Sequence, residues 1–367
     1  MKATDSDAFR VGADEGRVVL EFGRLVVPGA ATADGVRVAV TDRVLLTPVA
    51  AERLLWTLRQ ALLRPRVDRQ ALGAGGDALA GPSGLGAAPV NLPSDPAAAA
   101  AARLLDLVTG LGVPRLHERS FRMSQGSLQS HRFLLSMNVS DLGVGACDRA
   151  LDVARALGMP DAAAGEARAQ FGTAHCVHFG FEAAAPSILC KLYLERLVPA
   201  PEAEAAAANG QAVLLHQAWK WDTEGVAVRT RYDWFPGLDE AGIAQRLSRL
   251  FQSAGALVQA GAVREVLALA ASRAPSLQYL EVHEDGGRHS FDLNLYPAEL
   301  HLRDITPHLL RLRDVYGIRP GQFQALLDQV RPRVLGHLAG GVHRDGRDFI
   351  NVYYGAAAVP AFASKLG

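Results

Sequence analysis

The stretch Ser187–Glu195 has the strict alternation of a β-strand, and it constrains the fold more than any other feature of the chain. Residues two apart on a strand share a face, so Lys191 and Tyr193 lie on one side and the apolar Ile188 and Leu192 on the other. The same pattern recurs later in GVAVRTRYDW, HSFDLNLY and DFINVYY. Repeated strands with one polar and one apolar face predict a sheet that closes around a polar interior.

An internal repeat begins at Pro96: one or two helices, then two strands, with a period of roughly 50–60 residues. The expected strands are Arg115–Met123, Leu128–Asn138, Gly172–Glu182, Ser187–Leu197, Ala212–Lys220, Gly225–Phe235, Leu277–His283, Arg288–Tyr296, Val334–His343 and Asp348–Tyr354. Antiparallel hairpins joined by helices can close into a ten-stranded barrel with the helices outside, an α+β fold. A parallel (β/α) barrel does not fit, because its strands are apolar on both faces.

Two further segments precede the barrel, which we expect to span residues 96–367. Residues 1–65 predict a small ββα domain, with strands at Arg17–Val27 and Gly35–Leu46 and a helix to about Leu63. Its DRVLLTP motif resembles the strand end of a small bacterial domain of unknown function. Residues 66–95 are rich in Gly, Ala and Pro and predict a linker. Because two strands leave open edges, we expect residues 15–65 to bind a protein partner or a second copy.

Composition narrows the functional classes. Lysine plus arginine equals aspartate plus glutamate at 38 each, which argues against nucleic-acid binding because that needs clustered cations. Cys147, Cys176 and Cys190 are odd in number and lack metal-type spacing, so we expect buried thiols in a reducing compartment. Neither a secretory signal core nor a membrane-spanning apolar run is present in the sequence, and a cytoplasmic protein without a membrane partner is therefore expected.

The repeat order and the strand motifs SHRFLLSMN, CKLYLE, VRTRY and NLY resemble those of aromatic prenyltransferases of the α-β-β-α (PT) barrel type, the group that includes dimethylallyltryptophan synthase. The resemblance covers about Asp95–Gly355. It implies an enzyme that moves an allylic isoprenoid from its diphosphate to an aromatic acceptor, which would be an indole, a phenol or a peptide side chain. It also implies that neither a metal nor another cofactor is needed.

Three groups of site residues follow from matching the family motifs position by position. The expected diphosphate-binding residues are Arg132, Lys191, Arg229, Arg231 and Asn294. The expected aromatic shield around the allyl cation consists of Tyr193, Tyr296, Phe349 and Tyr353. Glu118 is the expected catalytic carboxylate, which would orient the acceptor or take its proton. Arginine and lysine suit a metal-free diphosphate clamp, since both donate charge-assisted hydrogen bonds to phosphate oxygens.

Two other readings remain open from the sequence. The interior cations could simply pair with Glu182, Glu195, Asp233 and Asp292, and the barrel would then be a non-catalytic ligand- or peptide-binding or maturation protein whose N-terminal domain recruits a partner. A histidine-based metal oxygenase or hydrolase is the third possibility. His175 and His178 lie three apart on a predicted strand and therefore face opposite sides, so they cannot share an ion. We accordingly expect no metal site.

Overall fold

The structure is a computed structural model that describes residues 8–14, 17–26, 37–46 and 96–361, apart from 185, 186, 253, 275 and 344. Its contacts divide the chain into two units, Met1–Arg69 and Gln70–Gly367, and each unit is considered by itself. The helix expected up to Leu63 and the linker expected at 66–95 lie outside the described residues.

The N-terminal unit contains a three-stranded antiparallel sheet. Its strands are β1 (Ala8–Asp14), β2 (Arg17–Val26) and β3 (Arg37–Leu46), in the order β1-β2-β3. The sequence predicted β2 and β3 but not β1. The segment AFRVGAD has one β-branched residue, Val11, so its intrinsic preference for a strand is weak, and pairing with β2 decides its conformation.

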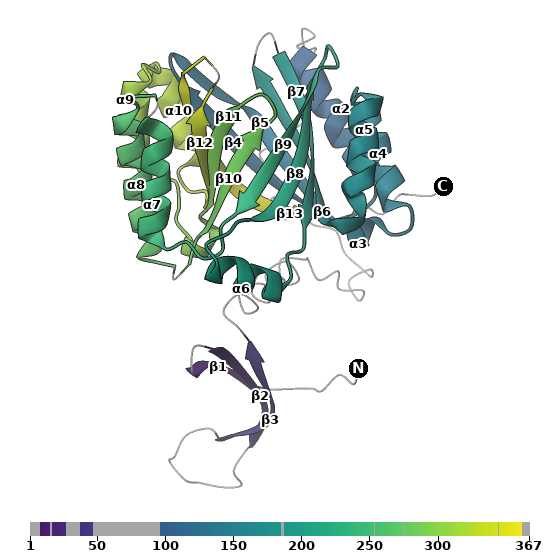
Figure 1. The fold of residues 1–367 in the computed structure, drawn as a ribbon, viewed down its shortest axis with the longest axis vertical. Helices are drawn as coiled ribbons and strands as arrows, with labels where there is room; N and C mark the ends of the chain where they lie inside the picture. Colours follow the sequence, from purple (N-terminus) through teal and green to yellow (C-terminus); the bar gives the residue numbers. More distant parts are fainter. Residues whose placement is uncertain are drawn as a thin grey trace, which may run out of the picture. The chain divides into compact units, whose positions relative to one another are not determined.

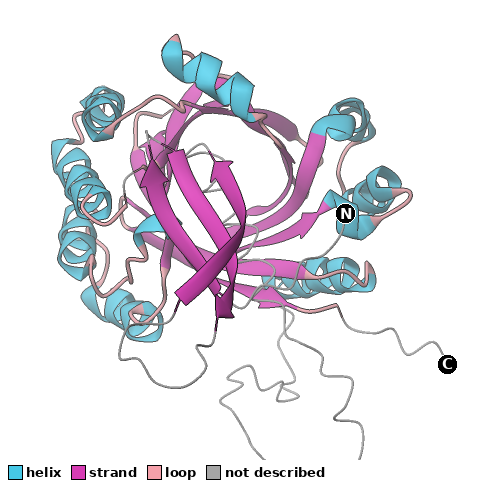
Figure 2. Ribbon diagram, turned by 90° about the horizontal axis from the view of Figure 1, so that it is seen from below, coloured by secondary structure: helices cyan, strands magenta, loops and turns pink. Residues whose placement is uncertain are grey.

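The second unit is a closed barrel of ten antiparallel strands (Figure 2). The strands are β4 (Arg115–Ser124), β5 (Ser127–Asn138), β6 (Ala174–Ala184), β7 (Ser187–Arg196), β8 (Val213–Asp222), β9 (Ala227–Trp234), β10 (Gln278–Glu284), β11 (Arg288–Asn294), β12 (Leu335–Val342) and β13 (Asp348–Val359). Each pairs with its neighbour in sequence, and β13 pairs with β4 to close the ring. The predicted barrel and its strand order are confirmed.

Helices surround the barrel wall (Figures 1 and 2). They are α2 (Pro96–Gly110), α3 (Val139–Leu142), α4 (Ala146–Ala156), α5 (Asp161–Gln170), α6 (Ala200–Ala208), α7 (Glu240–Gln252), α8 (Leu257–Ala271), α9 (Thr306–Val315) and α10 (Pro320–Val330). In α7 the buried Ile243, Leu247 and Phe251 recur every four residues and form one apolar stripe. The Asp239 carboxylate accepts a hydrogen bond from the Gly242 amide at 2.8 Å and caps the helix start. None of the helices among the described residues is long and apolar enough to cross a membrane.

The hydrophobic core lies between the outer face of the barrel and the helices. In one cluster, strands β10, β11, β12, β13 and β4 pack against helices α7, α8, α9 and α10. This cluster includes Phe291 and Ile350. In a second cluster, strands β5, β6, β7 and β8 pack against helices α2, α3, α4 and α5. This cluster includes Trp219 and Trp221. The Trp219 indole donates a hydrogen bond to a Glu166 carboxylate oxygen of α5 at 3.1 Å. Because the apolar strand faces are used against the helices, the opposite faces line the barrel interior.

Gly340 and Gly341 on β12 mark a close approach of neighbouring strands. A Cβ atom on Gly341 would lie 2.5 Å from the Ser290 Cβ and 2.6 Å from the His289 carbonyl oxygen on β11. The irregularity in β12 lies elsewhere, between Leu335 and Leu338. Gly341 is therefore required for close packing of β11 on β12 rather than for a bulge.

The substitution Gly341→Ala should lower the free energy of unfolding by about 1–3 kcal/mol, because the added methyl group overlaps a neighbouring strand. Gly261→Ala in α8 is the matched control, since nothing lies within 4 Å of a Cβ there, and it should be neutral or stabilise by roughly 0.5–1 kcal/mol. Urea unfolding followed by circular dichroism measures both. Equal midpoints for the two variants would contradict the packing argument.

Candidate active site in the barrel interior

Strand pairing identifies the side chains that face the interior. Directly opposed residues on neighbouring strands share a face, and Lys191 lies opposite Gly180 on β6 and Lys220 on β8. Following these pairs around the closed sheet gives the inward residues of every strand. Solvent reaches some of them, since the inward side chains of Glu195 and His337 are 28% and 26% exposed. The interior is therefore lined by polar groups but not filled by them.

Buried cations gather around the Glu182 carboxylate on β6. Arg122 Nη1 lies 2.6 Å from Oε1, Lys191 Nζ lies 2.6 Å from Oε2, and Arg132 also contacts Oε1. Arg132, Lys191 and Glu182 are all less than a tenth exposed. One carboxylate thus holds three cations from β4, β5 and β7, which leaves an excess of positive charge.

A second set of charges continues this layer around the barrel. Lys220 Nζ donates to a Glu284 oxygen at 2.8 Å, and Arg288 Nη1 lies 3.6 Å from the same oxygen. The guanidinium groups of Arg122 and Arg288 lie 4.9 and 4.8 Å from the centre of the Phe349 ring. We call the five basic residues the cation cluster: Arg122, Arg132, Lys191, Lys220 and Arg288. Only two carboxylates, Glu182 and Glu284, make the ion pairs described here with the five cations.

Burial and the excess of positive charge shift the pKa values of Lys191, Lys220 and Glu182. Burial, together with neighbouring cations, lowers the pKa of Lys191 to about 7 although Glu182 opposes the change. Burial and Arg288 lower the pKa of Lys220 to about 8. Burial alone would raise the pKa of Glu182, but Arg132, Lys191 and Arg122 hold it well below its usual value. An anion entering this layer would therefore favour the charged form of both lysines.

Tyrosines form the next layer along the barrel axis. Tyr193 follows Lys191 by two residues, a rise of roughly 7 Å, and its ring centre lies 5.8 Å from that of Tyr232 on β9. Tyr353 faces the interior opposite Ser120. Burial raises the pKa of all three phenols, so they stay protonated at neutral pH and present neutral aromatic surfaces.

Acidic and imidazole groups occupy the layer beyond the tyrosines. The Tyr296 hydroxyl donates to Glu118 Oε1 at 2.5 Å, and burial raises the pKa of Glu118. His337 Nδ1 donates to Asp292 Oδ1 at 2.7 Å. Burial would lower the pKa of His337, but Asp292 outweighs it and raises the value to about 9. His337 is therefore an imidazolium whose ring lies 6.0 Å from that of Tyr353.

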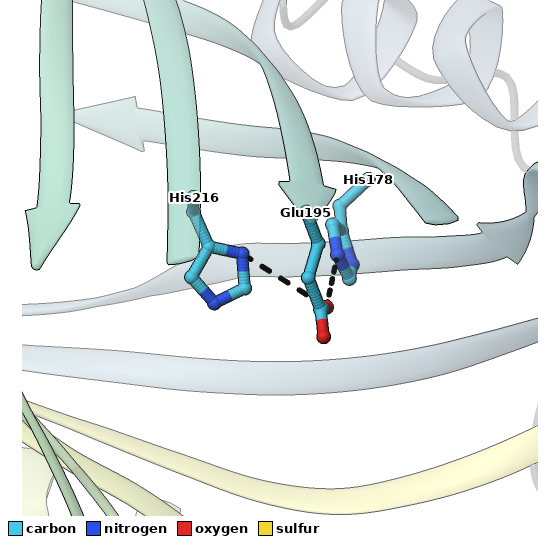
Figure 3. Close-up of side chains that lie close together, drawn as sticks. All are labelled: His178, Glu195 and His216. Atoms are coloured by element: carbon cyan, nitrogen blue, oxygen red, sulfur yellow. Dashed lines mark hydrogen bonds and ion pairs between the residues drawn. The ribbon is translucent and has the colours of Figure 1, made fainter. Parts of the chain in front are cut away.

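Three more side chains of this layer come from adjacent strands (Figure 3). His178 Nε2 donates to Glu195 Oε2 at 3.0 Å, and His216 Nδ1 lies 3.9 Å from the same oxygen. The Ser136 hydroxyl lies 2.7 Å from His178 Nδ1. His178, Glu195 and His216 stand on β6, β7 and β8, respectively, and their side chains point toward one another inside the barrel.

Solved structures share this architecture. PriB, in a binary complex with product diphosphate, is 14% identical with a TM-score of 0.51, over 71% of this chain and 90% of that chain. The 5-dimethylallyltryptophan synthase of Streptomyces coelicolor is 15% identical with a TM-score of 0.47, over 65% of this chain and 80% of that chain. No protein-family model matches the sequence, and no curated protein matches it significantly. The second unit has the PT-barrel fold.

Most of the expected site residues meet inside this PT barrel. Arg132 and Lys191 belong to the cation cluster, Tyr193 and Tyr353 to the tyrosine layer, and Glu118 lies beyond them. Phe349 contacts the guanidinium groups of two cluster arginines, and Tyr296 donates a hydrogen bond to Glu118. The alternative pairing of cations with Glu182 also occurs.

The expectation that Arg229 and Arg231 face the interior was wrong. On β9, Thr230 and Tyr232 lie opposite Ala218 and His216 and face inward, so the two arginines face outward. They pair with Asp285 and Asp233 and are 44% and 55% exposed. The prediction assumed that the polar face of every strand points inward. On this strand the outer face is exposed to solvent, and it carries the charges.

Asn294 also lies away from the cation cluster. It is the last residue of β11, six residues after Arg288, which is a rise of roughly 20 Å. Its side-chain oxygen accepts a hydrogen bond from the Tyr296 amide at 3.1 Å. Its position therefore supports the turn after β11, and the expected contact with a diphosphate held by the cation cluster does not fit this distance.

Several interior residues were missed from the sequence. They are Arg122, Lys220, Arg288, Tyr232, His178, His216 and His337. Arg122 and Lys220 could have been found by extending the alternation of Glu118 and His216 along β4 and β8. Tyr232 required the register of β9, and the histidines required knowledge of which strands are neighbours.

Substituting Glu182 by glutamine should destabilise the fold by about 3–5 kcal/mol, because the buried Arg132 and Lys191 and the largely buried Arg122 lose their shared negative charge. The matched control is Glu265→Gln, whose carboxylate pairs with Arg311 and His308 at the exposed surface and should matter little. Thermal and urea unfolding compare the two variants. Unchanged stability of Glu182→Gln would mean that the cations do not need this counter-charge.

Proposed function

We propose that the protein is an aromatic prenyltransferase that transfers an allylic isoprenoid from its diphosphate to an indole, a phenol or a peptide side chain. The observation that carries this proposal is the cation cluster, in which five basic residues, Arg132 and Lys191 buried and the other three largely buried, make their ion pairs with two carboxylates of the described part of the chain. Such a surplus of buried positive charge is costly unless an anion binds there. The PT-barrel fold and the diphosphate in the PriB complex support a diphosphate as that anion.

The cations would act on the leaving group. As the bond between C1 of the isoprenoid and the diphosphate oxygen breaks, its electron pair stays on that oxygen, and negative charge grows there. Arg122, Arg132 and Lys191 would stabilise this charge with donors that are already in place. A cluster of this kind would ionise the diphosphate without a metal ion.

The aromatic layer would protect the allyl cation. Tyr193, Tyr232 and Tyr353 would offer their ring faces to the cation and keep water from it. The acceptor ring then forms a bond to C1 and loses a proton to a base. Glu118 would orient the acceptor by accepting a hydrogen bond from it, in place of the one from Tyr296. The carbon that is alkylated would depend on this orientation.

A second candidate is a non-catalytic barrel that binds a ligand or peptide, with the N-terminal unit recruiting a protein partner. Glu182 favours it, because this carboxylate already neutralises part of the cation cluster. The inward face of β9 favours it too, since Val228 and Thr230 stand there without charge. A cytoplasmic location and binding through residues 15–65 are further predictions that fit either candidate.

Calorimetric titration in EDTA with the thiolodiphosphate analogues of dimethylallyl and geranyl diphosphate tests the diphosphate site. We expect micromolar binding that Lys191→Ala and Arg132→Ala each weaken by roughly 10–100-fold, the worth of a charge-assisted hydrogen bond. Arg229→Ala is the matched control, because it removes a cation from the outer face of the same barrel. Absence of binding to folded protein, or equal weakening by Arg229→Ala, would overturn the proposal and favour the second candidate.

The affinity for the same analogue should fall as the pH rises from about 6 to about 9. Below pH 7 both lysines are protonated in the empty protein, whereas near pH 9 both must take up a proton on binding, which costs roughly tenfold or more in affinity. Lys191→Arg should flatten the profile, because arginine stays charged over this range. An affinity independent of pH in the wild-type protein would argue that neither lysine contacts the diphosphate.

A further inference from the structure

Three potential metal ligands meet in the acidic end of the barrel interior (Figure 3). His178, Glu195 and His216 stand on the adjacent strands β6, β7 and β8, and each offers one donor atom. These atoms all lie within 4.8 Å of one another. Two imidazoles and one carboxylate form a ligand set that binds first-row transition metals well.

The spacing suits a single ion. With metal–nitrogen and metal–oxygen bonds of about 2.0–2.2 Å in tetrahedral geometry, neighbouring donor atoms lie roughly 3.3–3.6 Å apart. The two distances to Glu195 Oε2, 3.0 Å from His178 Nε2 and 3.9 Å from His216 Nδ1, lie on either side of this value. Small rotations of the side chains would therefore bring all three atoms to bonding distance.

His216 carries an unsatisfied donor atom at the centre of the site. Its Nδ1 is shielded from solvent and has no hydrogen-bond partner in the described part of the chain. A buried polar nitrogen without a partner is costly, and native proteins rarely keep one without a reason. A metal ion between Nδ1 and the Glu195 carboxylate would remove this cost.

Ser136 provides the outer support that metal-bound histidines need. Its hydroxyl lies 2.7 Å from His178 Nδ1. If His178 bound an ion through Nε2, the proton would move to Nδ1 and Nδ1 would donate to the Ser136 oxygen. A hydroxyl can reverse its role in this way because it both donates and accepts.

We infer that His178, Glu195 and His216 bind one divalent transition-metal ion of the zinc class and leave one coordination position open to the barrel interior. The open position follows from the exposure of the Glu195 and His216 side chains, 28% and 19%, on the inward face. A carboxylate, phenolate or imidazole of a ligand in the barrel could complete the coordination. This inference does not depend on the proposed function, because the ion would not contact the cation cluster.

The test uses the full chain after dialysis against EDTA and titration with Zn²⁺ and Co²⁺. Calorimetry should give one ion per chain, and the Co²⁺ protein should show the strong visible absorption of four- or five-coordinate cobalt. His216→Ala and the isosteric Glu195→Gln should each weaken binding by about 100-fold or more, and Ser136→Ala by about tenfold. Circular dichroism checks that each variant is folded. If His216→Ala does not fold, His216→Gln replaces it in the titration.

The matched control is the double variant His283→Ala with His289→Ala. These imidazoles lie 3.0 Å apart at an exposed site on β10 and β11 and are the obvious source of surface binding. The inference fails if the wild-type protein binds no ion, if the cobalt spectrum is octahedral, or if this double variant loses binding while His216→Ala keeps it. Thiolodiphosphate titration of Glu195→Gln separates the two proposals, since its affinity should match that of the wild type.

Discussion

Closure of the ten-stranded sheet is the constraint on which the rest of the second unit depends. Once β13 pairs with β4, every strand has two neighbours, so the backbone groups of the wall are satisfied without an open edge. Each strand must then place alternate side chains inside and outside. The helices take up the apolar faces of most strands, and the remaining faces can hold charged and aromatic side chains in fixed positions. The site is therefore a consequence of strand register.

Glu182 has two opposite effects: it stabilises the empty barrel, and it competes with a diphosphate for the same cations. It lowers the cost of burying Arg122, Arg132 and Lys191, because it supplies a shared counter-charge. It also occupies donors that a diphosphate would need. A dianionic or trianionic group brings more charge and more acceptor oxygens than one carboxylate, and lysines with lowered pKa values gain most from its arrival. A barrel that is stable when empty and still attracts polyanions would need a balance of this kind.

The sequence predicted the barrel closely and the site partly. Strand alternation and the repeat order were enough for all ten strands, and they placed Lys191 and Tyr193 inside, because β7 has a clear apolar face under helices. Arg132 was identified from the family motif. They failed on β9, where Arg231 lies on a solvent-exposed outer face. Periodicity separates the two faces of a strand but does not say which one is inside. Contacts across the closing pair of strands, such as the hydrogen bond from Arg122 on β4 to Asn351 on β13, depend on closure and cannot be read from local pattern.

The order of the layers gives the interior a direction. Positive charge lies near the hairpin ends of the strands, tyrosines lie in the middle, and Glu118, Asp292 and Glu195 lie beyond them together with the histidines. A substrate with an anionic end would enter this field in one orientation, since its anion is attracted by the cation cluster and repelled by the carboxylates. An allyl group attached to that anion would then reach the tyrosines, and the acceptor would bind in the remaining space beside the acidic layer. Under the proposed function, the same gradient that aligns the diphosphate would also keep the two reactants on opposite sides of the aromatic layer, so that they meet only where water is excluded.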